Sequence, residues 1–590
     1  MGGFEGFNFS MPKNAKRVMI KTVLIIDVIL LLVFVLANKF LLYIPYDWTF
    51  LFPIASVFIV VNAFLLLPFW LGAKRGLVLS VIILLIALAI PLYSSSIFQY
   101  EKLRALAGEI QEETFETDLQ LVDLNKLPII HADLARNLGE KKLGEIASLG
   151  SQVVAGNFTL QQIAGELFYV APLEHAGFFK WFQNRSGTPG YLMVNATKEN
   201  DARLVTELDG KPLNLKYLES AYLGSEINRY VFGQENKLGI QNYSFELDDS
   251  GRPYWIVSLY EKSVVLGGNK IVGTLIVDVQ TGETKKYSVE DTPEWVDRIQ
   301  PKSVVTEHLQ DYGMLVHGPF NFSNKDKVRL TEGMQVLYNG SECFYYSGVT
   351  SVNRDESLVG FYLTNTRTGE TTMYKVTGAI ESAGVTSAEG KVQQYGYRGT
   401  YPILINLQKQ PTYFITLLDK KGLIKSYAFV NVENYNVVGI GETLQQAYDD
   451  YVEILSRDSG LNFLENAMQV ELEGTIDRIG MVMKNDTTIY LFTLEGNPIT
   501  FIGTTEKNQT IALAKAGDRV KITYIEDLLD TITISTFENL TIQEQQNALQ
   551  KEDVTHLPNA AQNEGIKDQA SESESKNESE VDSKGLTEAK

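Results

Sequence analysis

The residue types that most often perform enzymatic chemistry are sparse in this chain. Its 590 residues include one cysteine, Cys343, and five histidines. A cysteine nucleophile needs a base such as His308 or His317 close by. Cys343 instead stands in an aromatic run, Ser-Glu-Cys-Phe-Tyr-Tyr, where a cysteine usually packs as a small apolar side chain. The Gly-x-Ser-x-Gly turn of serine hydrolases is absent from the sequence. These patterns do not indicate a nucleophilic enzyme.

The remaining polar residues show no metal or nucleotide signature. No His-x-x-x-His pair, Walker loop or Gly-x-Gly-x-x-Gly turn occurs in the sequence. The run Asp-Asp-Ser-Gly at 248–251 has calcium-ligand residue types but not their twelve-residue spacing, so we expect a hairpin turn there. The prediction is a chain that uses no cofactor, binds no metal ion and is not an enzyme.

A polar loop between two aromatic strands is the best candidate for a binding surface. Residues 351–357 read Ser-Val-Asn-Arg-Asp-Glu-Ser. Loops on rigid sheets often carry binding residues, and tyrosine-rich strands suit contact with a protein or a glycan. The alternative is a solvated loop beside an ordinary half-buried sheet. The predicted surface consists of Asn353, Arg354, Asp355, Tyr345, Tyr346, Tyr395 and Tyr397.

Three apolar runs fill the first hundred residues, at 22–43, 50–72 and 77–94. Each is long enough to cross a bilayer, which takes about 20 apolar residues. Asp27 stands about two turns inside the first run. An ionisable group within a span is a functional candidate. The alternative is that it lies near the inner interface and reaches water or a lysine.

The charges that flank these runs are asymmetric. Basic residues precede the first run and separate the second from the third, whereas few charges separate the first from the second. Because short cytoplasmic segments carry an excess of Lys and Arg, the N-terminus is predicted to be cytoplasmic and residues after about 95 extracytoplasmic. A large extracytoplasmic part with a single cysteine is typical of a bacterial cell envelope. We therefore expect a multi-pass protein of a bacterial cell membrane. The basic residues are Lys13, Lys16, Arg17, Lys21, Lys74 and Arg75.

The net charge of −20 and the pI near 4.9 argue against nucleic-acid binding, which requires basic residues that neutralise phosphates. The last residues, 543–590, are rich in Glu, Ser and Asn. They contain too little apolar surface to offset the entropy cost of ordering, so an acidic disordered tail is predicted.

The pattern between these ends indicates a membrane-anchored α+β protein. We expect a cytoplasmic tail at 1–21, three transmembrane helices within 22–94, a helical stalk at 95–118, α+β parts at 119–310 and 311–460, and a small β-barrel at 468–542. Thr159-x-x-Gln162 has the form of a capping box before the apolar residues 163–170, which predicts that a helix begins there. A second capping box, Thr-Leu-Gln-Gln at 443–446, predicts an amphipathic helix.

One motif is repeated within the α+β region. Thr-Gly-Glu-Thr-x-x-Tyr occurs at 281–287 and again at 368–374, each time after an apolar strand. The run Asp-Lys-Lys-Gly at 419–422 suggests a third strand–turn–strand. The repetition predicts duplicated hairpin modules. These hairpins, around 254–287 and 345–374, resemble PepSY-type extracytoplasmic modules, and the resemblance implies a role in binding or restraining envelope proteins.

The segment 470–542 contains five or six short strands and a Gly-Asp-x-Val strand entry at 517–520, and it resembles a small OB-like barrel. Taken together, the sequence predicts a non-catalytic envelope scaffold or regulator that binds another envelope protein or a cell-wall polymer. The alternatives are a membrane subunit of a transport or secretion complex, and an envelope enzyme with an unrecognised site.

Overall fold

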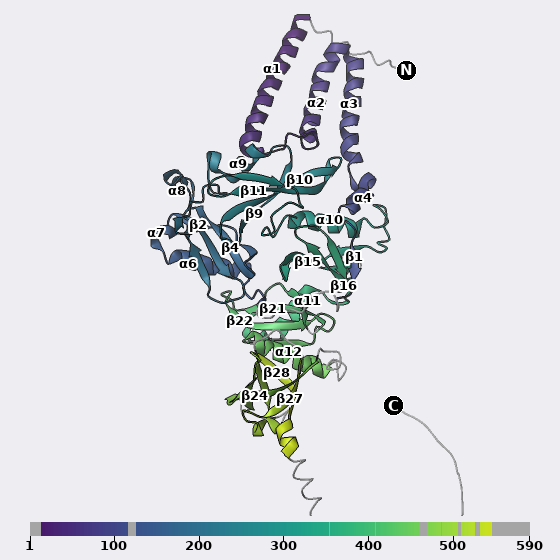
Figure 1. Ribbon diagram of the computed structural model, residues 1–590. Coiled ribbons are helices and arrows are strands. Elements are labelled where there is room, and N and C mark those ends of the chain that lie inside the picture. The colour runs from purple at the N-terminus through teal and green to yellow at the C-terminus, as the bar shows by residue number, and fades with distance from the viewer. Residues whose placement is uncertain are drawn as a thin grey trace, which may run out of the picture. The chain divides into compact units, whose positions relative to one another are not determined.

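The computed structural model describes residues 13–115, 126–352, 354–407, 409–458, 469–484, 487–505, 509–525 and 531–545 (Figure 1). The chain forms two compact units. The first comprises Met1–Val470 with Ile525–Ile532, and the second comprises Glu471–Tyr524 with Thr533–Lys590. Most of the predicted cytoplasmic tail from 1 to 12, and the predicted acidic tail from 546 onward, lie outside the described residues.

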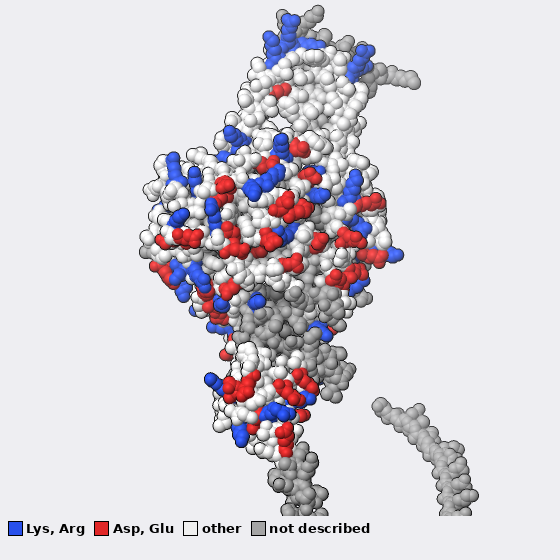
Figure 2. All heavy atoms as spheres, in the orientation of Figure 1, with Lys and Arg blue, Asp and Glu red and all other residues white. Residues whose placement is uncertain are grey.

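The first unit begins with the three predicted apolar helices. They are α1 (Lys13–Ala37), continued by the π-helix η1 (Asn38–Leu42), then α2 (Trp48–Leu71) and α3 (Ala73–Tyr93). Each is long and apolar enough to cross a membrane, which confirms the three-helix prediction. Figure 2 shows basic side chains at the end of these helices away from the rest of the chain, and largely uncharged sides.

Helices α2 and α3 form a close antiparallel pair. Gly76 lies against the backbone of α2, where a Cβ atom would come within 2.3 Å of Leu67. The Ser80 hydroxyl is buried and donates to the Ala63 carbonyl oxygen at 2.8 Å. Small residues of this kind let two membrane helices approach closely. Helix α1 is exposed along most of its length, and none of the residues in its most apolar stretch is buried.

The predicted stalk at 95–118 is wrong in its extent and its environment. The helix there, α4 (Ser96–Ala105), ends well before residue 118, and a short strand β1 (Gln111–Glu113) follows. Leu103 and Ala107 are buried, and Arg104 Nε donates to the Tyr312 carbonyl oxygen at 3.0 Å. The apolar positions that suggested a free helix therefore pack against α10 (Lys302–Met314). This segment is part of the α+β body.

The first sheet of the body corrects a second prediction. The expected helix at 163–170 is a hairpin of β3 (Thr159–Ile163) and β4 (Glu166–His175). Ala164 and Gly165 both have positive φ angles, which turn the chain back on itself. The Gln161 amide is buried and pairs with the Leu247 backbone through two hydrogen bonds. Tertiary pairing of this kind overrides the local capping-box pattern.

The first sheet contains the order β2-β4-β5-β6, with β3 paired to β4. Its elements are α6 (Ala132–Gly144), α7 (Ala147–Gly150), β2 (Val153–Ala155), α8 (Phe178–Gln183), β5 (Tyr191–Asn195) and β6 (Ala202–Val205). The short strands β7 (Glu207–Leu208) and β8 (Lys211–Pro212) and the turn η3 (Leu223–Ser225) follow.

The second sheet has the antiparallel order β12-β11-β10-β9 and follows α9 (Ile227–Gln234). Its strands are β9 (Gly239–Leu247), β10 (Pro253–Val264), β11 (Gly267–Asp278) and β12 (Thr284–Tyr287). Helix α10 then leads into the third sheet. The boundary expected between residues 310 and 311 falls inside α10, so it does not separate two elements.

The third sheet has the order β1-β17-β16-β15-β13, with β14 on β15 and β18 on β16. Its remaining strands are β13 (Val328–Leu330), β14 (Gln335–Asn339), β15 (Glu342–Ser351), β16 (Arg354–Asn365), β17 (Thr371–Tyr374) and β18 (Gly378–Ala379). Strand β1 joins β17 in parallel, which ties the segment after α4 into this sheet.

The fourth sheet follows α11 (Glu381–Lys391) and η4 (Gln393–Tyr395), and α12 (Leu444–Asp458) packs on it as the second capping box predicted. Its strands are β19 (Arg398–Gly399), β20 (Ile403–Leu407), β21 (Gln410–Leu418), β22 (Ile424–Asn431) and β23 (Val438–Gly441). Within the described residues, these four sheets, a separate two-stranded sheet of β7 and β8, and the helices that pack on the sheets confirm the mixed α+β class.

The repeated Thr-Gly-Glu motif forms the same turn twice. In the β11–β12 turn, Asp278 Oδ1 accepts hydrogen bonds from the backbone N–H groups of Gln280 and Thr281. In the β16–β17 turn, Asn365 Oδ1 accepts the equivalent pair from Arg367 and Thr368. The glycine of each motif has a positive φ, 78° in Gly282 and 80° in Gly369. The two turns are therefore alike in backbone conformation and in hydrogen bonding.

The third suggested copy belongs to a different turn type. Asp419 Oδ1 accepts from the N–H groups of Lys421 and Leu423 in the β21–β22 hairpin. The Asp248 carboxylate makes the equivalent bonds, to Ser250 and Arg252, in the β9–β10 hairpin. The predicted hairpin at 248–251 is thus confirmed, and its counterpart is the turn at 419–422.

The second unit is an antiparallel sheet with the strand order β24-β25-β26-β28-β27, in which the first and last strands close on each other. Its buried side chains include Phe492, Phe501 and Phe537, whose rings lie 5.6 Å apart in the pairs that involve Phe492. Its elements are β24 (Gln469–Lys484), β25 (Thr487–Leu494), β26 (Thr500–Thr504), η5 (Gln509–Leu513), β27 (Arg519–Ile525) and β28 (Thr531–Asn539).

Candidate functional site

The predicted tyrosine surface is wrong at its two central residues. Tyr345 and Tyr346 are 4% and 0% exposed, and they point to opposite faces of β15. Tyr345 packs near Leu309 of α10, whereas Tyr346 packs in the cluster that contains Tyr413. Both faces of this sheet are covered, so an aromatic run that suggested an exposed face fills two cores instead.

The structure describes only some of the other members of the predicted surface. Asn353 lies outside the described residues. Arg354 and Asp355 begin β16, and their side chains are not among those described. Tyr395 is 62% exposed and stacks on Tyr397 with a centroid distance of 5.3 Å.

The cysteine is placed as a packed side chain. Cys343 is buried, and burial raises the pKa of its thiol to about 11. A thiol with this pKa is protonated at neutral pH and is a poor nucleophile. His308 bonds to the Asn269 carbonyl oxygen and His317 to Asp326. Within the described ranges, no group of three or more His, Cys, Asp or Glu side chains is arranged to hold a metal ion.

A cavity of about 240 Å³ lies between the second and third sheets. The end of α4, strand β11, helix α10 and the second Thr-Gly-Glu turn form its walls. The lining residues that carry polar side chains are Glu109, Lys270, Gln300, His308, Thr364, Thr368, Glu370 and Thr371. Sequence reasoning missed this cavity, although one of its walls is the motif that the repeat had singled out.

Hydrogen bonds hold the second Thr-Gly-Glu turn, which forms one wall of the cavity, against the segment that precedes α10. The backbone N–H groups of Ile299 and Gln300 both donate to the Thr366 carbonyl oxygen, at 3.0 and 2.8 Å. The Arg367 guanidinium donates to the carbonyl oxygens of Thr292 and Pro293, each at 2.8 Å. The second Thr-Gly-Glu turn is therefore fixed against the segment that leads into α10.

The cavity offers both hydrogen-bond donors and acceptors. His308 Nε2 lies 2.8 Å from the Asn269 carbonyl oxygen, so this nitrogen carries the proton and Nδ1 is an acceptor when the ring is neutral. Burial lowers the pKa of His308, which keeps it neutral at pH 7. Lys270 adds a positive charge, and Glu109 and Glu370 each add a negative charge. This set suits recognition of a small polar group or a peptide segment.

Asp27 of the first apolar helix has a partner in the next helix. Asn62 Nδ2 donates to Asp27 Oδ1 at 3.2 Å and also to the Phe58 carbonyl oxygen at 3.1 Å. Both side chains lie close to the middle of their helices. The contact is a polar bridge between two apolar helices.

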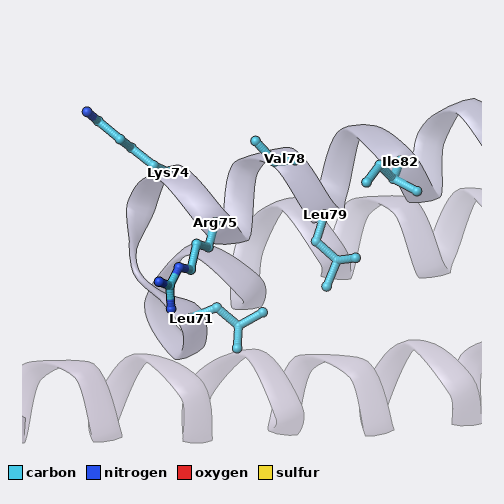
Figure 3. Close-up of a pocket in the computed structure, with 6 residues that line it drawn as sticks. All are labelled: Leu71, Lys74, Arg75, Val78, Leu79 and Ile82. Carbon is cyan, nitrogen blue, oxygen red and sulfur yellow. The ribbon is translucent and has the colours of Figure 1, made fainter.

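A shallow groove of about 430 Å³ runs along the α2–α3 hairpin near its turn (Figure 3). Leu71, Val78, Leu79 and Ile82 line it, and Lys74 and Arg75 stand at its end. In Figure 3, Arg75 extends toward Leu71 while Lys74 extends away from the groove. The groove therefore has apolar walls, with two basic residues at its end.

The loop between α1 and α2 binds directly to the α+β body. The Tyr43 hydroxyl donates to Glu226 Oε2 at 3.1 Å, and the Tyr46 N–H donates to the Asn236 carbonyl oxygen at 2.6 Å. At the end of α3, Ser94 Oγ donates to the Val264 carbonyl oxygen at 3.2 Å. The body is therefore attached at two places to one end of the helices. No sequence pattern indicated these contacts.

The chain was also compared with known proteins. It matches no model of a protein family, and no curated protein matches its sequence.

Proposed function

We propose that the protein is a non-catalytic scaffold or regulator of a bacterial cell envelope. Its N-terminus is cytoplasmic, its three helices span the membrane, and its α+β body lies outside the cell. In this role it binds another envelope protein or a cell-wall polymer. The observation that carries the proposal is the cavity between the second and third sheets, with Thr368 and Glu370 of a repeated turn in its wall.

Two features support a binding role for this body. The Asp278 and Asn365 turns are alike in their hydrogen bonds, and a helix precedes each of the two sheets. This supports duplicated modules of PepSY type, whose expected role is to bind or restrain envelope proteins. We also propose that the second unit is a small OB-like barrel. Its acidic setting favours protein contact over nucleic-acid binding.

The basic residues support the orientation. Lys74 and Arg75 occupy the α2–α3 turn, and Lys16, Arg17 and Lys21 lie near the start of α1. All lie at the end of the helices opposite the contacts made by Tyr43 and Ser94. By the positive-inside rule that end faces the cytoplasm, and the body then faces outward.

The test uses two matched positions of the repeated turn. A photocrosslinking amino acid replaces Glu370, in the cavity wall, or Glu283, the same position of the first turn. The full-length protein is crosslinked in intact membranes and its adducts are identified by mass spectrometry. We expect a specific envelope protein, or cell-wall fragments, at position 370 and not at 283. The same abundant neighbours at both positions would contradict the proposal.

The enzyme alternative is tested on the purified full-length protein. Incubation with peptidoglycan and with envelope peptides is expected to release no fragments. Release of fragments by an activity that co-purifies with the protein through every step would refute the non-catalytic proposal.

A second candidate function is a membrane subunit of a transport or secretion complex. The Asp27–Asn62 bridge and the exposed length of α1 favour it, because unpaired apolar helices are covered in complexes by partner helices. Loss of function in Asp27→Ala, with the body still folded and the crosslinks at position 370 unchanged, would favour this candidate.

A further inference from the structure

Five large apolar side chains cluster on the surface of the body around the short helix α8. They belong to Phe178, Phe179, Phe182, Tyr222 and Leu223, and here they are called the aromatic patch. Phe179 is 77% exposed and Phe182 is 53% exposed. The patch is continuous, because the Phe178 ring contacts Phe179, Phe182 and Tyr222 at centroid distances of 5.6, 6.0 and 5.0 Å.

The aromatic patch is rigidly supported from beneath. Trp181 of α8 is 5% exposed and packs in the core that lies against the second sheet. Its ring lies 5.3 Å from that of Tyr222. Because the buried Trp181 fixes α8, Phe178, Phe179 and Phe182 cannot turn inward without displacing this core. Their exposure is therefore built into the fold.

A chain of contacts connects the patch to the membrane helices. Leu223 belongs to the patch, and its carbonyl oxygen accepts a hydrogen bond from Arg229 Nη1 at 2.8 Å. The other terminal nitrogen of Arg229 donates to the Phe40 carbonyl oxygen at 3.3 Å, and its guanidinium lies 5.2 Å from the Phe40 ring. Phe40 is in the last turn of the first apolar helix. In Figure 1, α9 lies next to the lower end of α1, and α8 lies at the upper left edge of the body.

The composition of the patch is that of a membrane interface. Aromatic side chains concentrate where a bilayer meets water, and the spans themselves expose Tyr46, Trp48 and Tyr93 at this end. Lys180 lies within α8 and the Arg185 guanidinium stands 4.4 Å from the Phe182 ring. A short helix with phenylalanines and basic residues is suited to the headgroup layer of an anionic bilayer.

We propose that the aromatic patch docks on the outer surface of the lipid bilayer that α1–α3 cross. Phe179 and Phe182 enter the interfacial layer, and Lys180 and Arg185 face anionic headgroups. The body is thereby held by a third attachment, in addition to the loop at Tyr43 and the end of α3 at Ser94. This inference depends on the membrane-spanning assignment and not on the binding partner proposed above.

The test uses the full-length protein in vesicles of phosphatidylglycerol and phosphatidylethanolamine. An environment-sensitive fluorophore is attached to Phe179→Cys or, as the control, to Tyr395→Cys, in a Cys343→Ala background. Tyr395 is similarly exposed but follows α11, away from the membrane helices. We expect nitroxide-labelled lipid to quench the probe at 179 strongly and a water-soluble quencher to do so weakly, with the reverse at 395.

A second experiment tests the contribution of the basic residues. It uses Lys180→Gln, with the fluorophore at position 179. One basic residue near an anionic surface changes the ratio of docked to free patch by about fivefold. We expect this loss on the anionic vesicles and none on pure phosphatidylcholine vesicles. Equal quenching at positions 179 and 395 would overturn the proposal. So would a probe at 179 that is shielded from both quenchers, because a protein partner or a second copy would then cover the patch.

Discussion

Asp278 and Asn365 occupy equivalent places in two different sheets, and each side chain holds the turn that follows it through the same backbone contacts. Asp278 Oδ1 lies 2.9 and 2.8 Å from its two donors, and Asn365 Oδ1 lies 2.9 and 3.1 Å from its own. Only the second turn borders the inter-sheet cavity. A comparison of the two turns can therefore distinguish the role of the motif in folding from its role in the wall of the cavity.

The glycines of the two turns are predicted to differ in their tolerance of a methyl group. Both have positive φ angles, so Gly369→Ala should cost about 1–2 kcal/mol of stability. In Gly282→Ala the added Cβ would lie 2.5 Å from the Tyr217 ring, which adds about 1–3 kcal/mol. Chemical unfolding of the two variants in the same detergent checks this. Equal losses would show that Tyr217 moves aside freely.

Replacing Asp27 tests the bridge between α1 and α2. Hydrogen bonds between membrane helices contribute about 0.6 kcal/mol on average and up to about 1.7 kcal/mol. Asp27→Ala removes the acceptor of Asn62 Nδ2 and should lower stability by this amount, whereas Asp27→Asn retains an acceptor oxygen. Thermal unfolding in detergent measures both variants. An equal loss in Asp27→Asn and Asp27→Ala would mean that the negative charge, rather than the hydrogen-bond acceptor, matters.

Glu174 is predicted to make stability depend on pH. Burial raises the pKa of its carboxyl group to about 7, against hydrogen bonds from Ser220 that lower it. Between about pH 4.5 and 7 the unfolded chain ionises this group while the folded protein keeps it protonated, so the folded state loses stability as the pH rises. Glu174→Gln removes the titration but keeps an acceptor for Ser220. The variant should gain about 2.5 kcal/mol over the wild type between pH 5 and pH 8.

Glu145 provides a control of opposite sign. Its hydrogen bond and ion pair with Lys142 lower the pKa of this exposed carboxyl group. The stabilisation it gives is present above its unfolded pKa and is lost as the pH falls through its folded pKa. Urea unfolding at several pH values compares Glu174→Gln with Glu145→Gln. A constant difference between Glu174→Gln and wild type across this range would refute a raised pKa at Glu174.

The proposed orientation predicts which cysteine substitutions react in intact cells. A membrane-impermeant maleimide should label Tyr395→Cys directly and Lys74→Cys only after permeabilisation. Cys343 is buried and should give little background in the folded protein. Labelling of Lys74→Cys in intact cells would place the α2–α3 turn outside and reverse the topology.

Local sequence determined those features that depend on neighbouring residues. The apolar runs became α1, α2 and α3 because a helix pairs its own backbone N–H and C=O groups, which an apolar segment of about 20 residues requires where water cannot pair them. The hairpins at 248–251 and 281–284 followed from Asp, Gly and Thr, whose side chains bond their own backbone. The helix at α12 followed from its capping box and apolar face.

Contacts between distant residues decided the rest. The capping-box pattern at 159–162 gave way to a strand because Gln161 pairs with Leu247, far along the chain. The apolar spacing of the expected stalk proved to be a face buried against α10. Tyr345 and Tyr346 alternate as a half-exposed strand would, but sheet and helix layers cover both sides of β15. The alternation of residues in a strand shows which side chains share a face. Only the packing of the sheet against other layers decides whether that face is exposed to water.

The candidate sites divide in the same way. The sequence alone identified Asp27 as an unusual group within a span, because its surroundings in the chain are apolar. It was the tertiary structure that placed Asn62 opposite it, joined β11 and the second Thr-Gly-Glu turn around a cavity, and left Phe179 exposed on the surface of the body. Cavities and surface patches are made by residues from several elements, so their existence depends on chain-distant packing that no local pattern encodes.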